Sequence, residues 1–112
     1  MVVIYHNPRC ITSRKTLALI EKKGVKPRVI EYLKTPPSAA ELKRLLKMLG
    51  KTPRELLRAK EAREAGLNKP GLTDSALIAA MVKNPIVIER PIVVNGAQAT
   101  LGRPPEAVLK IL

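Results

Sequence analysis

The only cysteine of the chain, Cys10, lies in a segment whose residue types favour thiol chemistry. The apolar run from Val2 to Tyr5 predicts a strand before it, and the residues from Thr12 onward predict a helix after it. Cys10 is therefore expected in the turn before a helix, where backbone N–H groups and the positive end of the helix dipole stabilise a thiolate and bind anions. We interpret Cys10 as a nucleophile, although an unpaired cysteine is most often a small buried hydrophobe.

The polar neighbours of Cys10 add to this interpretation. His6 either lowers the thiol pKa as an imidazolium or accepts the thiol proton, unless it is an ordinary surface or core histidine. Arg9 and Arg14 bring positive charge, and Arg14 is a candidate ligand of an anionic substrate. Ser13 stands where a Cys-x-x-Cys motif has its second cysteine, so it is either a donor to the thiolate or a first-turn helix residue. Because a serine cannot resolve a mixed disulfide, the second thiol must come from another molecule.

The chain is strongly basic, with 21 Lys and Arg against 9 Asp and Glu, which gives a net charge of +12. Such a surplus attracts anions without choosing among them. The only aromatic residues are Tyr5 and Tyr32, whereas proteins that bind single-stranded nucleic acids use aromatic stacking. The basic residues are scattered instead of forming one tract. We therefore expect a solvated basic surface and no nucleic-acid partner.

The length of 112 residues and the apolar content of 46% predict a single domain over residues 1–112. No apolar stretch is long enough to span a bilayer, and the N-terminus lacks the pattern of a signal peptide. A small secreted domain with a lone exposed thiol would be unusual. We expect a cytoplasmic monomer without a membrane partner.

The two ends of the chain predict the strands of one sheet. A helix from Thr12 to Lys23 ends at Gly24, and a second short strand at residues 29–30, continuing to Tyr32, makes a βαβ unit with parallel strands. Near the other end, Asn95-Gly96 separates two β-prone runs and predicts a hairpin. A last helix starts at Pro104-Pro105.

Between these halves the sequence predicts a helical insertion at about residues 38–84. The first helix, 38–49, opens with a capping box and carries leucines at i, i+3, i+4 and i+7. The second, 52–64, opens with Thr-Pro and a glutamate placed for another capping box. The third, 73–83, ends at Asn-Pro. The expected fold class is α/β, with a mixed four-stranded sheet built from βαβ and ββα halves.

Two arginines stand beside expected turns of this sheet. Arg90 precedes Pro91 at the entry to an apolar strand, and Arg103 precedes Pro104 at the end of the hairpin. A guanidinium at such a margin can clamp a tetrahedral oxyanion through two parallel hydrogen bonds. From the residues alone, Arg58, Arg90 and Arg103 cannot be distinguished from arginines that only contribute to the charge of the surface.

Over almost its full length the chain resembles the glutaredoxin-coupled arsenate reductase family (ArsC type), which has a thioredoxin-like fold and a single catalytic cysteine. The matching motifs are Tyr5-His6-Asn7-Pro8, Cys10, Thr12-Ser13-Arg14, Thr16-Leu17, Tyr32-Leu33, Pro36-Pro37-Ser38, Glu41-Leu42, Leu56-Leu57-Arg58, Pro85-Ile86, Arg90-Pro91-Ile92-Val93-Val94 and Arg103-Pro104. They occur in order and with similar spacing, so the combination is more specific than any one motif.

The resemblance implies a role for individual residues. Cys10 would be the nucleophile, and His6 would help to keep it as thiolate. Three arginines would bind the arsenic oxyanion: Arg58, Arg90 and Arg103. The resemblance also implies a cis peptide bond before Pro91. Glutathione as co-substrate and glutaredoxin as partner would complete the reduction of arsenate to arsenite. The resemblance implies that this reaction needs no metal and no bound cofactor.

Two other functions remain open at the level of the sequence. Spx-type transcriptional regulators share this fold and bind RNA polymerase, but they typically carry Cys-x-x-Cys, and Ser13 argues against such a disulfide switch. A general glutathione-linked thiol oxidoreductase would use the same activated Cys10 without arsenate.

Overall fold

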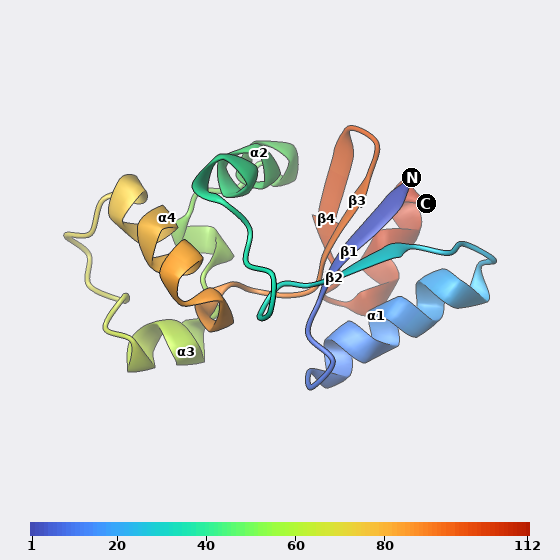
Figure 1. Cartoon of the computed structure of the whole chain (residues 1–112), viewed down its shortest axis with the longest axis horizontal. Helices are drawn as coiled ribbons and strands as arrows, with labels where there is room; N and C mark the ends of the chain where they lie inside the picture. Colours follow the sequence, from blue (N-terminus) through green and yellow to red (C-terminus); the bar gives the residue numbers. More distant parts are fainter. The chain divides into compact units, whose positions relative to one another are not determined.

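The computed structural model describes residues 1–112 and divides them into two compact units (Figure 1). The first unit comprises residues 1–35 and 90–112, and the second comprises residues 36–89. The second unit is close in extent to the predicted helical insertion. That the two units form a single domain stays a prediction. No helix of the structure has the length and apolar content needed to cross a bilayer.

The first unit contains the whole sheet, in the strand order β2-β1-β3-β4. Strand β1 pairs in parallel with β2 and antiparallel with β3, which in turn pairs antiparallel with β4. The mixed four-stranded sheet and the α/β class are therefore as predicted. The elements of this unit are β1 (Val2–His6), α1 (Ile11–Lys22), β2 (Arg28–Glu31), β3 (Ile92–Asn95), β4 (Gln98–Leu101) and the 3₁₀ helix η3 (Pro105–Ile111).

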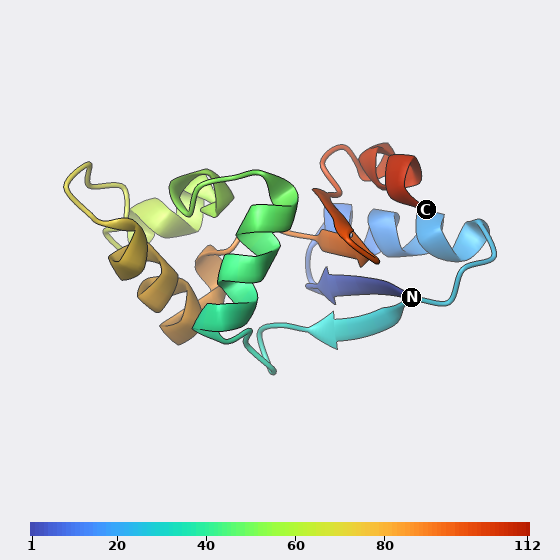
Figure 2. The ribbon, with the colours of Figure 1, turned by 90° about the horizontal axis from the view of Figure 1, so that it is seen from above.

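The core of the first unit lies between the sheet and the helices α1 and η3, which cover one face of it (Figure 2). Side chains of a strand alternate between the two faces, so Val2 and Ile4 of β1 point to the same side. They pack there with Val93 of β3, Ile20 of α1 and Val108 of η3. This packing holds α1 and η3 against the sheet.

Three local predictions for this unit need correction. Strand β2 ends at Glu31, and Tyr32 lies outside it. The last helix is a 3₁₀ helix. The hairpin loop is Gly96-Ala97, because Asn95 remains in β3 and pairs with Gln98. The Asn95 amide donates from Nδ2 to the Ile111 carbonyl at 2.6 Å, which holds it at the strand end. Gly96 then supplies the positive φ, +62°, that a type II′ turn needs at its first position.

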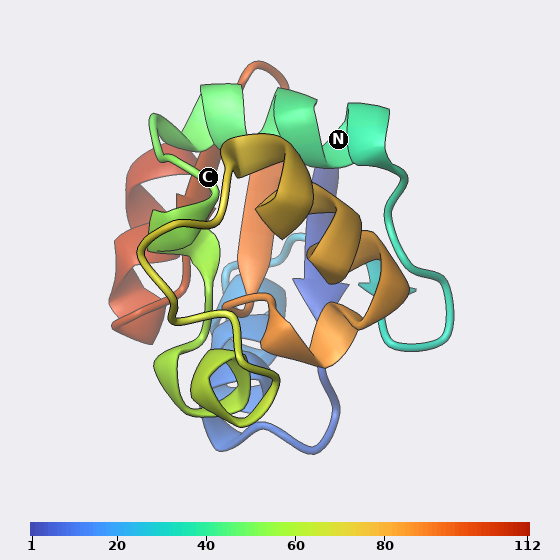
Figure 3. The same cartoon turned by 90° about the vertical axis from the view of Figure 1, so that its left-hand side faces the viewer.

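The second unit is helical (Figure 3). Ser38 caps α2 by accepting a hydrogen bond from the Glu41 N–H at 3.1 Å, and Thr73 caps α4 in the same way. The predicted leucine stripe of α2 is largely buried, and α2 contacts α4. The elements are α2 (Ala39–Leu49), the 3₁₀ helix η1 (Arg54–Leu56), α3 (Ala59–Glu64), α4 (Asp74–Lys83) and the 3₁₀ helix η2 (Pro85–Val87).

The predicted helix over residues 52–64 is wrong, because the structure divides it into η1 and α3. Its capping box is confirmed, since Thr52 and Glu55 exchange side-chain-to-backbone bonds of 2.9 and 3.2 Å. The helix then stops at Leu57, whose backbone is extended (φ −72°, ψ 137°) and forms an antiparallel bridge with Ile88. A pairing with a distant segment here overrides local helix propensity.

Candidate active site

Cys10 is the N-cap residue of α1 and is partly exposed. The turn before it is held by Asn7, whose carbonyl accepts from the Cys10 N–H at 3.0 Å and whose Oδ1 accepts from the Arg9 N–H at 3.0 Å. The Cys10 carbonyl begins the helix by accepting from the Arg14 N–H. This geometry directs the backbone N–H of Ser13 to the sulfur. The position of the thiol at a helix N-terminus is thus confirmed.

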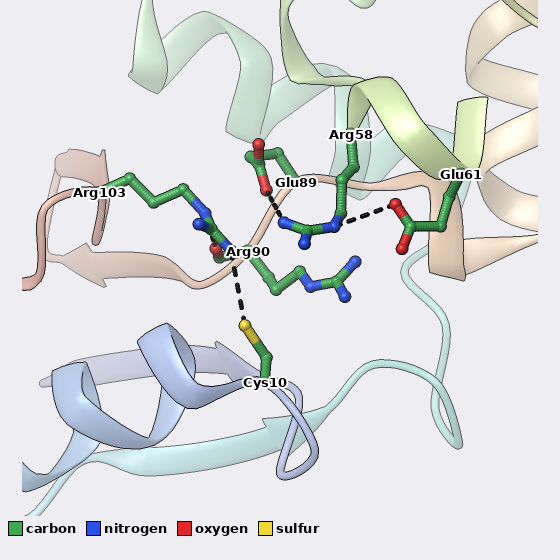
Figure 4. Close-up of polar contacts among 6 residues, drawn as sticks. All are labelled: Cys10, Arg58, Glu61, Glu89, Arg90 and Arg103. Carbon is green, nitrogen blue, oxygen red and sulfur yellow. Dashed lines mark hydrogen bonds and ion pairs between the residues drawn. The ribbon is translucent and has the colours of Figure 1, made fainter. Parts of the chain in front are cut away.

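An arginine distant in sequence, Arg103, reaches the sulfur of Cys10 (Figure 4). Arg103 places Nη2 3.5 Å from Cys10 Sγ and donates from Nε to the Arg90 carbonyl at 2.7 Å. The Arg90 side chain is almost fully buried and lowers the pKa of the thiol. The Arg90–Pro91 peptide bond is cis, as the resemblance implied, and Arg103–Pro104 is cis as well.

The pKa of Cys10 is lowered by this environment. Burial raises the pKa of the thiol, but the Ser13 N–H lowers it, as do the hydrogen bond and charge of Arg90 and the charge of Arg103. The lowering effects are larger in sum, so the site stabilises the thiolate more than water does for a free cysteine. The same donors suit an anion, because they are cationic or carry the helix dipole.

His6 and Ser13 form a buried pair behind the thiol. His6 Nδ1 lies 2.6 Å from Ser13 Oγ, which also accepts from the Asn7 N–H at 3.1 Å. The pKa of His6 is lowered, chiefly by burial; Glu31 opposes this shift and Arg14 adds to it. The lowered pKa favours the neutral imidazole of His6 and disfavours the imidazolium role. The backbone N–H of Ser13 lowers the pKa of the Cys10 thiol, and its side chain hydrogen-bonds His6.

Gly102 explains how Arg103 is placed. Its N–H donates to the Pro91 carbonyl at 2.9 Å, and its carbonyl accepts from Thr16 Oγ1 of α1 at 3.4 Å. A Cβ at this position would lie 2.6 Å from Thr16 Oγ1, 2.8 Å from Thr16 Cγ2 and 2.9 Å from Pro91 Cγ. Only glycine allows this close approach of β4, α1 and the loop at Pro91. Sequence reasoning missed this residue.

Arg14, predicted as a substrate ligand, is exposed and donates from Nη1 to the Pro8 carbonyl at 3.2 Å. This bond supports the turn that precedes Cys10. A direct contact of Arg14 with a substrate stays a prediction.

Arg58 belongs to the second unit and has a different environment. It is the N-cap residue of α3, and its Nε lies 3.0 Å from Glu61 Oε2 while its Nη1 donates to Glu89 Oε1 at 3.2 Å (Figure 4). Burial lowers the pKa of Arg58, but Glu89 and Glu61 raise it by more. The spacing of three residues between Arg58 and Glu61 is a signal that sequence reasoning missed. Glu89 has no such local signal.

The site of the first unit combines a nucleophilic thiol with positively charged groups that lower its pKa. A thiolate can attack an electrophilic centre, and guanidinium groups can neutralise the oxygens bound to that centre. No group of three or more His, Cys, Asp or Glu side chains that could hold a metal ion occurs in the structure.

Comparison with known proteins decides the family, because the ArsC family profile matches residues 5–111. The chain belongs to the ArsC family. The protein named YfgD of Escherichia coli strain K12 is 54% identical, with 99% of this chain and 96% of that protein covered. "Arsenate reductase" of Rhizobium meliloti strain 1021 is 49% identical, with 99% and 81% covered. The solved structure of "Arsenate reductase from Vibrio cholerae" has a TM-score of 0.94 and 54% identity, with 99% and 97% covered.

This ArsC-family chain thus brings six of its seven predicted site residues into the first unit. Arg103 contacts the sulfur of Cys10, and Arg90 lowers its pKa. His6 and Ser13 form a buried pair, and Arg14 supports the turn that precedes Cys10. The seventh, Arg58, is bound by carboxylates of the second unit.

Proposed function

We propose that this ArsC-family protein is an arsenate reductase with Cys10 as its nucleophile. The observation that carries the proposal is the surroundings of one sulfur: Arg103 Nη2 lies 3.5 Å from Cys10 Sγ, and the Ser13 N–H, Arg90 and Arg103 lower the pKa of the thiol. This arrangement favours a thiolate and an oxyanion in one place. Relatives named arsenate reductase, which align with nearly all of the chain, support arsenate as that oxyanion.

In the first step, the Cys10 thiolate attacks the arsenic of arsenate. An As–S bond forms, and a hydroxyl group of arsenate takes up one proton from the solvent and leaves as water. Arg90 and Arg103 neutralise the remaining oxyanion charge, and Arg58 is the third oxyanion ligand implied by the resemblance. His6 and Ser13 act behind the sulfur: as a neutral pair they position the turn that carries Cys10.

In the second step, the thiolate of glutathione attacks Cys10 Sγ. The As–S bond breaks, its electron pair reduces arsenic from As(V) to As(III), and arsenite leaves. Cys10 then carries a mixed disulfide with glutathione. Because Cys10 is the only cysteine, this disulfide needs an external resolving thiol, and glutaredoxin is the expected partner. The cytoplasm suits such a cycle, since it keeps glutathione reduced.

The test is a coupled assay of arsenate-dependent consumption of reducing equivalents with glutathione and glutaredoxin present. We expect turnover by the intact protein and none by Cys10→Ser. Arg28→Ala is the control for loss of one positive charge, because Arg28 is an exposed residue of β2. Absence of arsenate turnover in the intact protein would refute the proposal. Turnover of a glutathione mixed disulfide without arsenate would then favour a general thiol oxidoreductase.

A further inference from the structure

Exposed residues of the first unit border the partly exposed Cys10 on both sides. We call them the Cys10 rim, and they are Pro8, Arg9, Ile11, Arg14 and Lys15. Ile11 lies three residues before Arg14 and four before Lys15, so the three share one face at the start of α1. Arg14 is tied to the preceding turn by its bond to the Pro8 carbonyl at 3.2 Å. The rim is therefore one continuous surface next to the thiol.

The Cys10 rim combines one apolar side chain with positive charge. Ile11 is 62% exposed although it is the first residue of α1. Arg9, Arg14 and Lys15 carry the charge, and none of them forms an ion pair in the structure. The first turn of α1 has no acidic residue, and the first one in the chain is Glu21. The rim can thus offer an apolar contact and three cations to an incoming molecule.

The proposed function, on which this inference rests, brings a second thiol to the rim. The resolving thiolate attacks the glutathione sulfur of the mixed disulfide on Cys10. A new S–S bond joins it to glutathione, the old S–S bond breaks, and Cys10 leaves as a thiolate with the electron pair. The lowered pKa of Cys10 makes it a good leaving group. The attacking sulfur comes within two S–S bond lengths, about 4 Å, of Cys10 Sγ. A protein that carries this thiol must therefore contact the residues beside Cys10.

We propose that the Cys10 rim is the docking surface for the protein that carries the resolving thiol. This partner presents carboxylates and an apolar side chain around its own thiol. Contact removes the apolar surface of Ile11 from water, and the three cations attract an acidic surface before contact. Redox partners form small, transient interfaces, so a few residues of this kind have a large share in docking.

The experiment starts from the full chain carrying glutathione on Cys10 as a mixed disulfide. Quenched flow with mass spectrometry gives the second-order rate constant for its reduction by glutaredoxin. Dithiothreitol reduces the same disulfide without docking, so the ratio of the two rate constants isolates the contribution of the rim. Ile11→Ser should lower this ratio by about three- to tenfold, and Arg9→Glu by about tenfold at low salt. The effect of Arg9→Glu should shrink as ionic strength rises, because salt screens exposed charges.

The matched controls lie at the other end of α1, whose 12 residues extend about 18 Å. Lys22→Glu reverses one exposed charge in the last turn of this helix. Leu109→Ser replaces an apolar side chain that is 37% exposed and lies beside Lys23 and Val25. Both controls should leave the ratio unchanged. Circular dichroism identifies a variant that fails to fold, and the other rim variant then carries the comparison.

Three results would overturn the inference. The first is an equal loss with glutaredoxin and dithiothreitol in the rim variants, or an equal loss of the ratio in the controls. The second is a wild-type rate constant with glutaredoxin that does not fall as ionic strength rises. The third is a rate constant with free glutathione as large as that with glutaredoxin. Because the assay contains no arsenate, a rim effect in a protein that does not reduce arsenate would support the docking surface and refute the proposed function.

Discussion

Arginines in the two units of this ArsC-family protein serve different partners. In the first unit, Arg103 hydrogen-bonds the sulfur of Cys10, and both Arg90 and Arg103 lower the pKa of the thiol. In the second unit, Arg58 contacts Glu61 and Glu89. Arg90 and Arg103 lower the pKa of the thiol, whereas Arg58 is paired with two carboxylates. Residue type alone therefore does not set the electrostatic role of an arginine, because the side chains placed around it decide its net effect.

The largest expected effect comes from replacing an arginine at the sulfur. Arg103→Ala should lower kcat/KM for arsenate by about 100-fold or more, because it removes a preorganised donor to the developing charge. It should also raise the pKa of Cys10, measured from the pH dependence of alkylation. Arg58→Ala should lower turnover without moving the thiol pKa, since its charge is compensated. A thiol pKa raised equally by both substitutions would contradict the distinction between the two arginine sites.

A second prediction concerns the packing that places Arg103. Gly102→Ala should destabilise the protein by about 1–3 kcal/mol in urea unfolding, because the new Cβ would meet Thr16 and Pro91. The thiol pKa should rise as Arg103 shifts. Gly71→Ala is the control, since nothing lies within 4 Å of a Cβ there. Adding Thr16→Ala should recover part of the lost stability, and no recovery would show that Thr16 is not the limiting contact.

A third prediction concerns the effect of the Cys10 pKa on the stability of the protein. Although burial raises the pKa of Cys10, the Ser13 N–H and the two arginines lower it by more. The folded state then binds fewer protons than the unfolded state between the lowered pKa and the ordinary thiol value of about 8.5. The free energy of unfolding should rise with pH across this window. The contribution of Cys10 is fully present above the window and is lost as pH falls through the folded pKa. Urea unfolding of wild type and Cys10→Ser at several pH values checks this, because the serine variant should lack the dependence.

The smallest expected effect belongs to Arg14. Its exposed bond to the Pro8 carbonyl contributes less than about 1 kcal/mol. Arg14→Ala should therefore change stability slightly and kcat/KM for arsenate by less than about tenfold. Steady-state kinetics beside Arg103→Ala measure the difference. A loss as large as that of Arg103→Ala would instead make Arg14 a direct substrate ligand.

Sequence reasoning was most accurate where the interactions are local. The strand before Cys10, the N-terminus of α1, the capping box at Thr52 and the end of α2 at Gly50 are all confirmed. It failed where a distant segment intervened. The predicted helix over 52–64 breaks because Leu57 pairs with Ile88, and the hairpin loop shifts by one residue because Asn95 bonds the Ile111 carbonyl.

The sequence by itself determined the placement of Cys10, because caps, turns and helix ends depend on residues a few positions apart. It also determined that any redox cycle needs an external thiol, since no second cysteine exists. Only the tertiary structure decided which arginine meets which partner. Arg103 and Cys10 are 93 residues apart, and Arg58 and Glu89 are 31 apart. Such pairs form only after the sheet and the helical unit have closed long loops, so no local pattern specifies them.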